Sequence, residues 1–323
     1  MSETVVILFG KLSANPDADE LDVMDEIEVV KETLQSLGYK IQELEFDLNL
    51  EKTKQELLKI KPSFVFNIVE TIENSGELHY IAPALLESLK IPYSGVSSEH
   101  LVLTTNKVLT KEILRSNGIK TAEWFNLKEL EKLDKQKRYI LKPLKEDGSL
   151  GIDEGSVFYA SNAVYIDKIK NIANESFFIE EYIDGREFNV SVLGGKNGPE
   201  VLPIAEMKFH NFPDDKPKVM GFIAKWKEDS FEYKNTSRTF DIEFVKPGFK
   251  NEIEDLCKKC WHAFNSKGYI RIDIRLSKEN VPFVIEINGN PCISPGSGFY
   301  NAAKQAGYKF EDVMDRIIFD AFN

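Results

Sequence analysis

Residues 269–291 read YIRIDIRLSKENVPFVIEINGNP, two stretches of alternating polarity around a Lys278–Asn280 turn. This pattern predicts a β-hairpin. The positions of residues that face each other across a hairpin have a constant sum. A turn centred near residues 279–280 therefore places Asp273 directly opposite Glu286. Facing like charges destabilise a sheet, so this pair requires a counter-charge.

A divalent cation would supply that counter-charge. Asp273, Glu286 and Asn288 offer two carboxylates and an amide oxygen on one face of the hairpin. Hard cations such as Mg²⁺ take oxygen ligands of this kind, together with phosphates and waters. The alternative is that Arg271 and Arg275, which share that face, pair with the acids. The alternation of polarity leaves both interpretations open.

Length and composition narrow the class of protein. A chain of 323 residues predicts two or three domains. The net charge of −12 disfavours nucleic-acid or membrane-surface binding, because both partners are anionic. With three cysteines, no charged and then apolar leader, and no apolar run of about 18 residues, a cytoplasmic protein without a disulfide framework is expected.

The distribution of strand and helix patterns predicts three units, 1–95, 96–184 and 185–323. The first alternates strands and helices, which indicates a parallel sheet covered on both faces. Its expected strands are 5–9, 41–46 and 63–66, and its expected helices are 22–37, 51–58 and 77–89. In the second unit we expect a helix over 103–116 and strands over 138–143, 156–159 and 177–182. Strand 187–193 begins the third unit, which also contains a helix around 253–264 and the hairpin.

Two further segments carry groups that suit a nucleotide. Lys142 ends an apolar strand and precedes 145-KEDGSLG-151, where small residues would let backbone N–H groups approach phosphates. Glu180, Glu181 and Glu187 surround a tight turn and could accept hydrogen bonds from ribose hydroxyls or an exocyclic amine. Taken alone, the first segment is better interpreted as a plain turn, and the second is interpreted equally well as a solvated strand edge. Lys107, taken alone, reads as a solvated lysine.

Several other chemistries lack their motifs. The first strand is followed by 9-FGKLSANP-16, without the Gly-x-Gly-x-x-Gly of a nicotinamide site, and the chain has no Gly-x-x-x-x-Gly-Lys-Ser/Thr. The four histidines are scattered and form no triad with serine or cysteine. A nicotinamide oxidoreductase built on the first unit is therefore the weakest of the hypotheses.

In their order along the whole chain, these pieces resemble the ATP-grasp family, and within it D-alanine–D-alanine ligase and its relatives. The resemblance rests on Lys107, the "LKP…GSLG" loop, "FIEEYIDGREF", "AKW", "RIDIRL" and "EINGNP". It implies a three-domain ATP-grasp architecture of α/β and α+β type, with an N-terminal parallel-sheet domain and ATP between the other two domains.

The resemblance also implies roles for individual residues. Lys107, Lys142 and Ser149 would contact the ATP phosphates, Lys225 the γ-phosphate, Glu180 and Glu181 the adenine, and Glu187 the ribose. Asp273, Glu286 and Asn288 would hold two Mg²⁺ ions, with Mn²⁺ as a substitute, and Arg271 would stabilise the oxyanion. Glu70, Arg271 and Ser297 are the expected substrate contacts.

The implied reaction is amide formation between two small carboxylate or amino-acid substrates through an acyl phosphate. This chain departs from D-alanine ligases on the substrate side, with 10-GKLSANPDADE-20 near the N-terminus, Gly148 in the phosphate loop and Trp226 after the lid lysine. D-alanyl-D-alanine is therefore one of several candidate products. The alternative to a ligase is a nucleotide-binding regulatory or scaffold protein of this fold. A homodimer is possible, since dimers are common among similar ligases.

Overall fold

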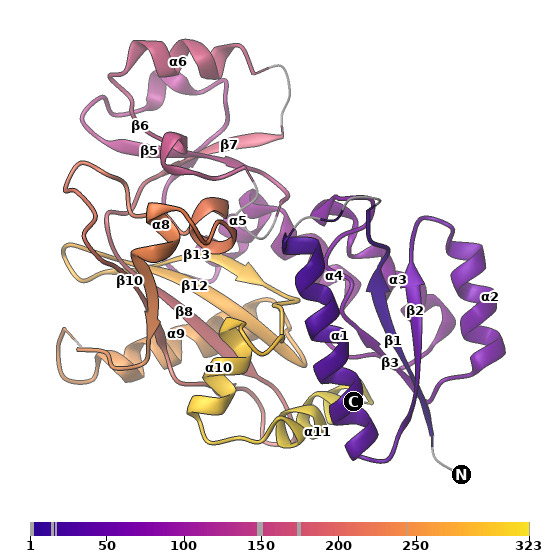
Figure 1. Cartoon of the computed structure of the whole chain (residues 1–323). Coiled ribbons are helices and arrows are strands. Elements are labelled where there is room, and N and C mark those ends of the chain that lie inside the picture. Colours follow the sequence, from indigo (N-terminus) through magenta and orange to yellow (C-terminus); the bar gives the residue numbers. More distant parts are fainter. Residues whose placement is uncertain are drawn as a thin grey trace.

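Three sheets organise the computed structural model, which describes residues 3–13, 16, 18–146, 151–172, 176–243 and 245–322 (Figure 1). In the first sheet, β1 (Thr4–Gly10) pairs in parallel with β2 (Lys40–Phe46) and β3 (Phe64–Asn67). The apolar run of β1 is buried on both faces, as expected for a covered parallel sheet. Helices α1 (Ala18–Ser36) and α11 (Phe310–Ala321) cover one face, and α2 (Leu50–Ile60) and α3 (Ile81–Leu89) cover the other. The predicted N-terminal parallel sheet is confirmed.

Two helix predictions need correction. The helix expected over 77–89 is a 3₁₀ turn, Gly76–Leu78, followed by α3. The helix expected over 103–116 is two helices, α4 (Ser98–Thr105) and α5 (Lys107–Ser116), separated by Asn106 in an extended conformation. The Asn106 side chain accepts hydrogen bonds from the first N–H groups of α5. This N-cap starts a new helix inside what reads as one apolar pattern.

The central sheet is antiparallel, in the order β4 (Trp124–Phe125), β7 (Phe177–Glu181), β5 (Arg138–Pro143) and β6 (Val157–Tyr159). Helix α6 (Ala163–Lys170) packs on it through a separate small core, at the top of Figure 1. The strands expected here are confirmed to within one residue at each end. Residues 147–150, which include the predicted phosphate-loop Ser149, lie outside the described residues.

The largest sheet runs β11 (Thr236–Thr239), β10 (Ala205–Phe209), β8 (Gly185–Leu193), β12 (Tyr269–Ser277) and β13 (Pro282–Asn288), with β9 (Glu200–Val201) beside β8. One face packs on α9 (Phe249–Ala263), where Cys257 and Cys260 are buried as ordinary core residues. Short helices α7 (Phe222–Trp226) and α8 (Phe231–Lys234) and helix α10 (Gly298–Gln305) complete this part.

The first and largest sheets share a core. Leu193, Tyr269, Phe299 and Met314 pack in the same cluster as the β1 side chain Val5. This contact brings α1 beside the segment that follows β13. The domain boundaries near 95 and 184 stay predictions. Within the described ranges, no helix is both long and apolar enough to cross a bilayer.

Candidate active site

The hairpin has the predicted register. Strand β12 pairs with β13 so that Asp273 lies opposite Glu286 and Arg271 opposite Asn288. A shift of one residue follows Asp273, which places Ile274 opposite Val284. The two acids and Asn288 therefore lie together at one end of the hairpin, next to β8.

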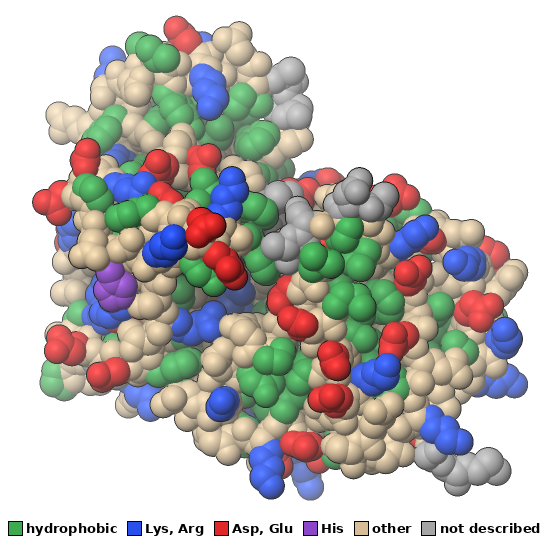
Figure 2. All heavy atoms as spheres, viewed as in Figure 1, with side chains coloured by type: hydrophobic (Ala, Val, Ile, Leu, Met, Phe, Trp, Pro, Cys, Tyr) green, Lys and Arg blue, Asp and Glu red, His purple; other side chains and the backbone are tan. Residues whose placement is uncertain are grey.

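A cavity of about 640 Å³ opens on this face of the sheet. Predicted site residues that line it are Glu70, Lys142, Glu187, Lys225, Arg271, Asp273, Glu286, Asn288 and Ser297. Figure 2 shows acidic and basic side chains intermixed over and around α8, on the side of the large sheet from which α7 and α8 border this cavity. The structure thus brings together residues from five separated parts of the chain.

The acid pair has cationic neighbours. Arg271 forms a two-point ion pair with Asp273, with Nε 2.8 Å from Oδ1 and Nη2 3.0 Å from Oδ2. Asn189 Nδ2 also donates to Asp273 Oδ1 at 2.9 Å. Lys107 Nζ lies 3.6 Å from Glu286 Oε1. The alternative of arginine pairing is therefore realised at Asp273 by Arg271, while the cavity beside the pair remains open.

The second arginine of the hairpin has another partner. Arg275 Nη2 lies 2.8 Å from Glu187 Oε2. Arg275 therefore neutralises Glu187 rather than the Asp273–Glu286 pair. Burial raises the pKa of Glu187, and the Arg275 guanidinium opposes this shift. The carboxylate predicted to hold the ribose thus lines the cavity in a buried ion pair.

Lys225 projects into the cavity from α7. Burial lowers its pKa, and the nearby Arg271 guanidinium lowers it further, whereas Asp273 and Glu286 oppose the shift. Arg238, which sequence reasoning missed, lines the same region of the cavity. Burial lowers the pKa of Arg238, and the Arg271 guanidinium lowers it further. Three cationic side chains therefore converge beside the acid pair, an arrangement suited to anionic ligands.

Lys142 is held from behind by a buried network. Glu180 accepts hydrogen bonds from Lys111 Nζ and, at 2.6 Å, from Lys142 Nζ. Burial alone would raise the pKa of Glu180, but the two ammonium groups outweigh it and lower the pKa. Glu181 instead pairs with Lys137 at 2.8 Å near the surface. Neither glutamate is among the residues that line the cavity, and their roles toward adenine stay predictions.

Lys107 is buried, with 4% of its surface exposed, which corrects the reading of it as a solvated lysine. It begins α5 behind the cavity, where Nζ donates to the carbonyl oxygen of Glu146 at the start of the predicted phosphate loop. Because α4 ends at Thr105 and α5 begins at Lys107, the boundary at Asn106 places Lys107 between Glu286 and that loop.

A second group of acids lies at the other end of the cavity. Asp22, Glu70 and Cys292 line it, and Glu26 lies directly behind them. Glu26 Oε1 accepts from the Ile293 N–H at 3.0 Å, and Cys292 Sγ donates to Asp22 Oδ2 at 3.0 Å. Sequence reasoning identified Glu70 but missed the other three.

Two acids that follow Glu70 in the sequence, Glu73 and Glu77, lie away from the cavity. Glu77 pairs with Lys145 at the surface, and Glu73 lines a separate surface pocket. Ser297, which lines the cavity, accepts a hydrogen bond from the Tyr300 N–H at 3.2 Å and caps α10.

Comparison with known proteins agrees with this geometry. Residues 113–319 match the family model described as D-Ala D-Ala ligase C-terminus. D-alanine–D-alanine ligase from Aquifex aeolicus is 28% identical over 318 residues, covering 97% of this chain and 99% of the relative. The Carboxydothermus hydrogenoformans ligase is 27% identical over 295 residues, with 87% of each chain covered.

Solved structures show the same fold. D-alanine–D-alanine ligase from Bacillus anthracis, complexed with ATP, superposes with a TM-score of 0.75 at 22% identity, over 100% of this chain and 97% of that one. The family model spans well over half of the chain. The chain therefore belongs to the D-alanine–D-alanine ligase family of ATP-grasp proteins, and it is an ATP-dependent ligase.

Proposed function

We propose that this ligase is Mg²⁺-dependent and joins a carboxylate to an amine through an acyl phosphate. The observation that carries the proposal is the facing pair Asp273 and Glu286, which lines a cavity together with Lys142, Lys225 and Arg271. Two facing acids beside three cations are suited to a metal–phosphate complex, in which both kinds of charge are needed.

The donor set fits a hard divalent cation. Asp273, Glu286 and Asn288 provide oxygen ligands only, and Asn288 Oδ1 accepts the Asn290 N–H at 2.8 Å, which fixes the amide orientation. Two ions are expected, held by these three residues and by nucleotide phosphates. When bound, the metal would neutralise phosphate charge during transfer.

Side chains of this protein would bind the phosphates and stabilise the charges that form during the reaction. Lys142 and Lys225 would bind and orient the phosphates, together with Lys107 and the loop that contains Ser149. A substrate carboxylate oxygen attacks the γ-phosphorus and ADP leaves. The amine then attacks the acyl carbon, phosphate leaves and the amine nitrogen loses a proton. Arg271 would hold the oxyanion that forms at the acyl carbon.

The substrates are small carboxylates and amines, with amino acids as the first class to test. Relatives are named D-alanine–D-alanine ligase, and D-alanyl-D-alanine is one candidate product here. Segment 10–20 and Trp226 depart from the D-alanine ligase pattern at positions expected to bind substrate, and these differences favour a different pair of substrates. Cytoplasmic location and a homodimer stay predictions.

An ADP-release screen tests this function. Single amino acids and pairs, in D and L forms, are incubated with ATP and Mg²⁺, and the products are identified by mass. We expect ADP release that requires a specific pair and yields an amide of the two. Tight ATP binding with no stimulation by any carboxylate and amine would instead support the scaffold alternative.

A further inference from the structure

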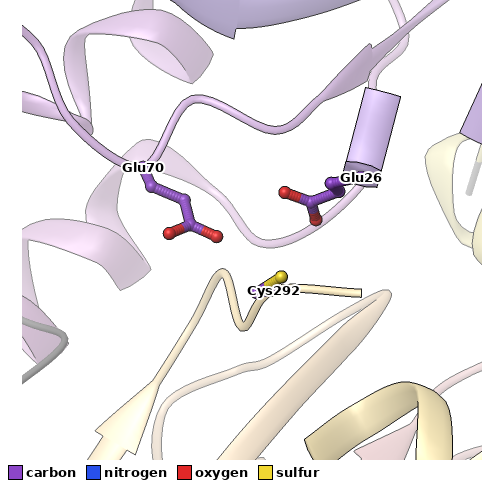
Figure 3. Close-up of side chains that lie close together, drawn as sticks. All are labelled: Glu26, Glu70 and Cys292. Atoms are coloured by element: carbon purple, nitrogen blue, oxygen red, sulfur yellow. The ribbon is translucent and has the colours of Figure 1, made fainter. Parts of the chain in front are cut away.

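At the acidic end of the cavity only Glu70 is an expected substrate contact, and its neighbours have no role in the reaction proposed above. Asp22 and Glu26 come from α1, Glu70 follows β3, and Cys292 follows β13. Figure 3 shows the carboxylates of Glu26 and Glu70 directed toward each other and toward the Cys292 sulfur. One ligand atom from each of these three residues lies within 4.8 Å of the others. Two carboxylates and a thiol thus converge where the cavity reaches the N-terminal sheet, and Asp22 joins them through its contact with Cys292.

The hydrogen bonds of the described residues satisfy only one of the two carboxyl oxygens of Glu26. Its side chain is buried, with 2% of its surface exposed, and Oε1 accepts from the Ile293 N–H. Its second oxygen, Oε2, has no hydrogen-bond partner in the described part of the chain. Burial raises the pKa of Glu26, and the charges of Glu70 and Asp22 raise it further. A buried carboxyl oxygen without a donor carries a desolvation penalty, so a ligand that supplies a donor here binds more tightly.

The acidic end is separate from the reacting end. Asn290 ties the acidic end to Tyr269, since its Oδ1 accepts from the Tyr269 hydroxyl at 3.3 Å and its Nδ2 donates to the carbonyl oxygen of Val69, next to Glu70. Tyr269 precedes Arg271 by two residues on β12, about 7 Å along the strand, and the Arg271 guanidinium contacts Asp273, two residues further on. A substrate whose reacting carboxylate lies against Lys225 and Arg271 therefore meets Glu26 with a more distant part. The α-amino group is only two bonds from the carboxyl carbon, so the side chain is the part that extends to the acids.

We propose that one of the two substrates is an amino acid with a basic side chain, whose cationic nitrogen binds between Asp22, Glu26 and Glu70. This proposal rests on the ligase function proposed above. A side-chain ammonium has three N–H donors and a positive charge, which match the buried Glu26 oxygen that lacks a donor and the acids around it. An apolar side chain of the same length would place a methyl group against Glu26 Oε2 without giving it a donor.

A divalent metal is the other ligand class that acids and a thiol suggest, and the thiol argues against it. Cys292 Sγ lies 3.0 Å from Asp22 Oδ2, a contact in which the thiol donates its hydrogen to the carboxylate and which a negatively charged thiolate would not make. Burial raises the pKa of the Cys292 thiol, and Glu26 and Glu70 raise it further. A metal would need the thiolate.

Calorimetry with size-matched amino acids tests the proposal without turnover. Ornithine is compared with norleucine, and 2,4-diaminobutyrate with norvaline, each in both chiral forms and with Mg²⁺ and a non-hydrolysable ATP analogue. We expect at least one basic amino acid to bind at least tenfold more tightly than its neutral partner, the effect of one added charged hydrogen bond. Glu26→Gln should remove that preference, whereas Glu28→Gln, an exposed acid on the same helix, should retain it. Asp22→Asn is the second variant should Glu26→Gln unfold.

The outcomes separate this inference from the ligase proposal. Basic amino acids that bind no more tightly than their neutral partners overturn the inference, whether or not either binds. ADP release with neutral pairs in the same preparation would then leave the ligase function intact. Binding of one Zn²⁺ per chain that is lost in Glu26→Gln and Cys292→Ser, without preference for basic amino acids, assigns a metal site and also overturns the inference.

Discussion

Asp273 on β12 lies directly opposite Glu286 on β13, and Arg271 holds Asp273 at two points. The same carboxylate thus has an arginine partner in the structure and, in the proposed reaction, a metal partner. Arg271 supplies the counter-charge of Asp273 in the structure. Metal binding and arginine pairing at Asp273 should therefore compete.

Replacement of Arg271 by Gln tests this competition. Without the guanidinium, Asp273 is available to the metal, so the Mg²⁺ concentration for half-maximal nucleotide binding should fall about threefold or more. Turnover should fall by at least ~100-fold, because the oxyanion loses its donor. Mg²⁺-dependent nucleotide binding and steady-state rates measure the two effects. A higher Mg²⁺ concentration for half-maximal nucleotide binding in Arg271→Gln would instead show that Arg271 assists the metal site.

Replacement of Glu286 by Gln should abolish turnover and preserve the fold. A neutral amide is a poor Mg²⁺ ligand, and loss of metal neutralisation is worth several kcal/mol, or at least ~100-fold in rate. ADP release and circular dichroism are the measurements. Glu279→Gln, at an exposed position in the turn of the same hairpin, is the matched control and should behave as the parent. Near-parental turnover of Glu286→Gln would refute the metal assignment.

Glu180→Gln should destabilise the protein. This change removes the anion that holds Lys111 and Lys142, and loss of one member of a buried ion network costs about 3–5 kcal/mol. Urea unfolding gives the stability. Glu181→Gln disturbs only a more exposed pair with Lys137 and should cost less than about 1 kcal/mol. Equal stability of the two variants would contradict a structural role for the Glu180 network.

Stability should fall between pH 6.5 and pH 4 because of two buried histidines. Burial lowers the pKa of His79 and of His100 from the ordinary 6.5 to about 4. The folded state keeps them neutral, so their contribution is complete above pH 6.5 and is lost as pH falls toward 4, because the unfolded state takes up the protons. Each contributes up to roughly 3 kcal/mol.

Unfolding measured across this pH range checks the assignment. His100→Gln removes one of the two histidines that titrate over this range, so its stability should change less steeply with pH than that of the parent, whatever its absolute stability. His262→Gln, which removes an exposed histidine of α9, should retain the parental slope. Parallel curves for parent and His100→Gln would exclude His100 as a source of the pH dependence.

The hairpin and its acid pair could be predicted because they depend on local pattern. Alternation of polarity fixes the face of each side chain, and the short turn fixes the register across the strands. The same reasoning predicted the strands of the first and central sheets. It mispredicted the 103–116 segment because apolar spacing continues through Asn106, whereas the N-cap at Asn106 starts a new helix.

The acidic end could not be predicted in the same way. Glu26 and Cys292 are 266 positions apart, and only the packing of α1 on the segment after β13 brings them together. One signal was present. Glu26 sits within the apolar stripe of α1, next to Ile27 and four residues before Val30, where an acid has to be buried. The burial of Lys107 could not be predicted either, because it depends on contacts with Glu286, which is distant in the sequence.

Transfer of ¹⁸O from a labelled carboxylate into phosphate tests the central claim most directly. When the carboxylate attacks ATP, one carboxyl oxygen remains with phosphorus after the amine displaces it. Using the substrate pair found in the ADP-release screen, we predict one ¹⁸O atom in each phosphate released. Phosphate without ¹⁸O, formed at the same rate as the amide, would contradict carboxylate activation by ATP.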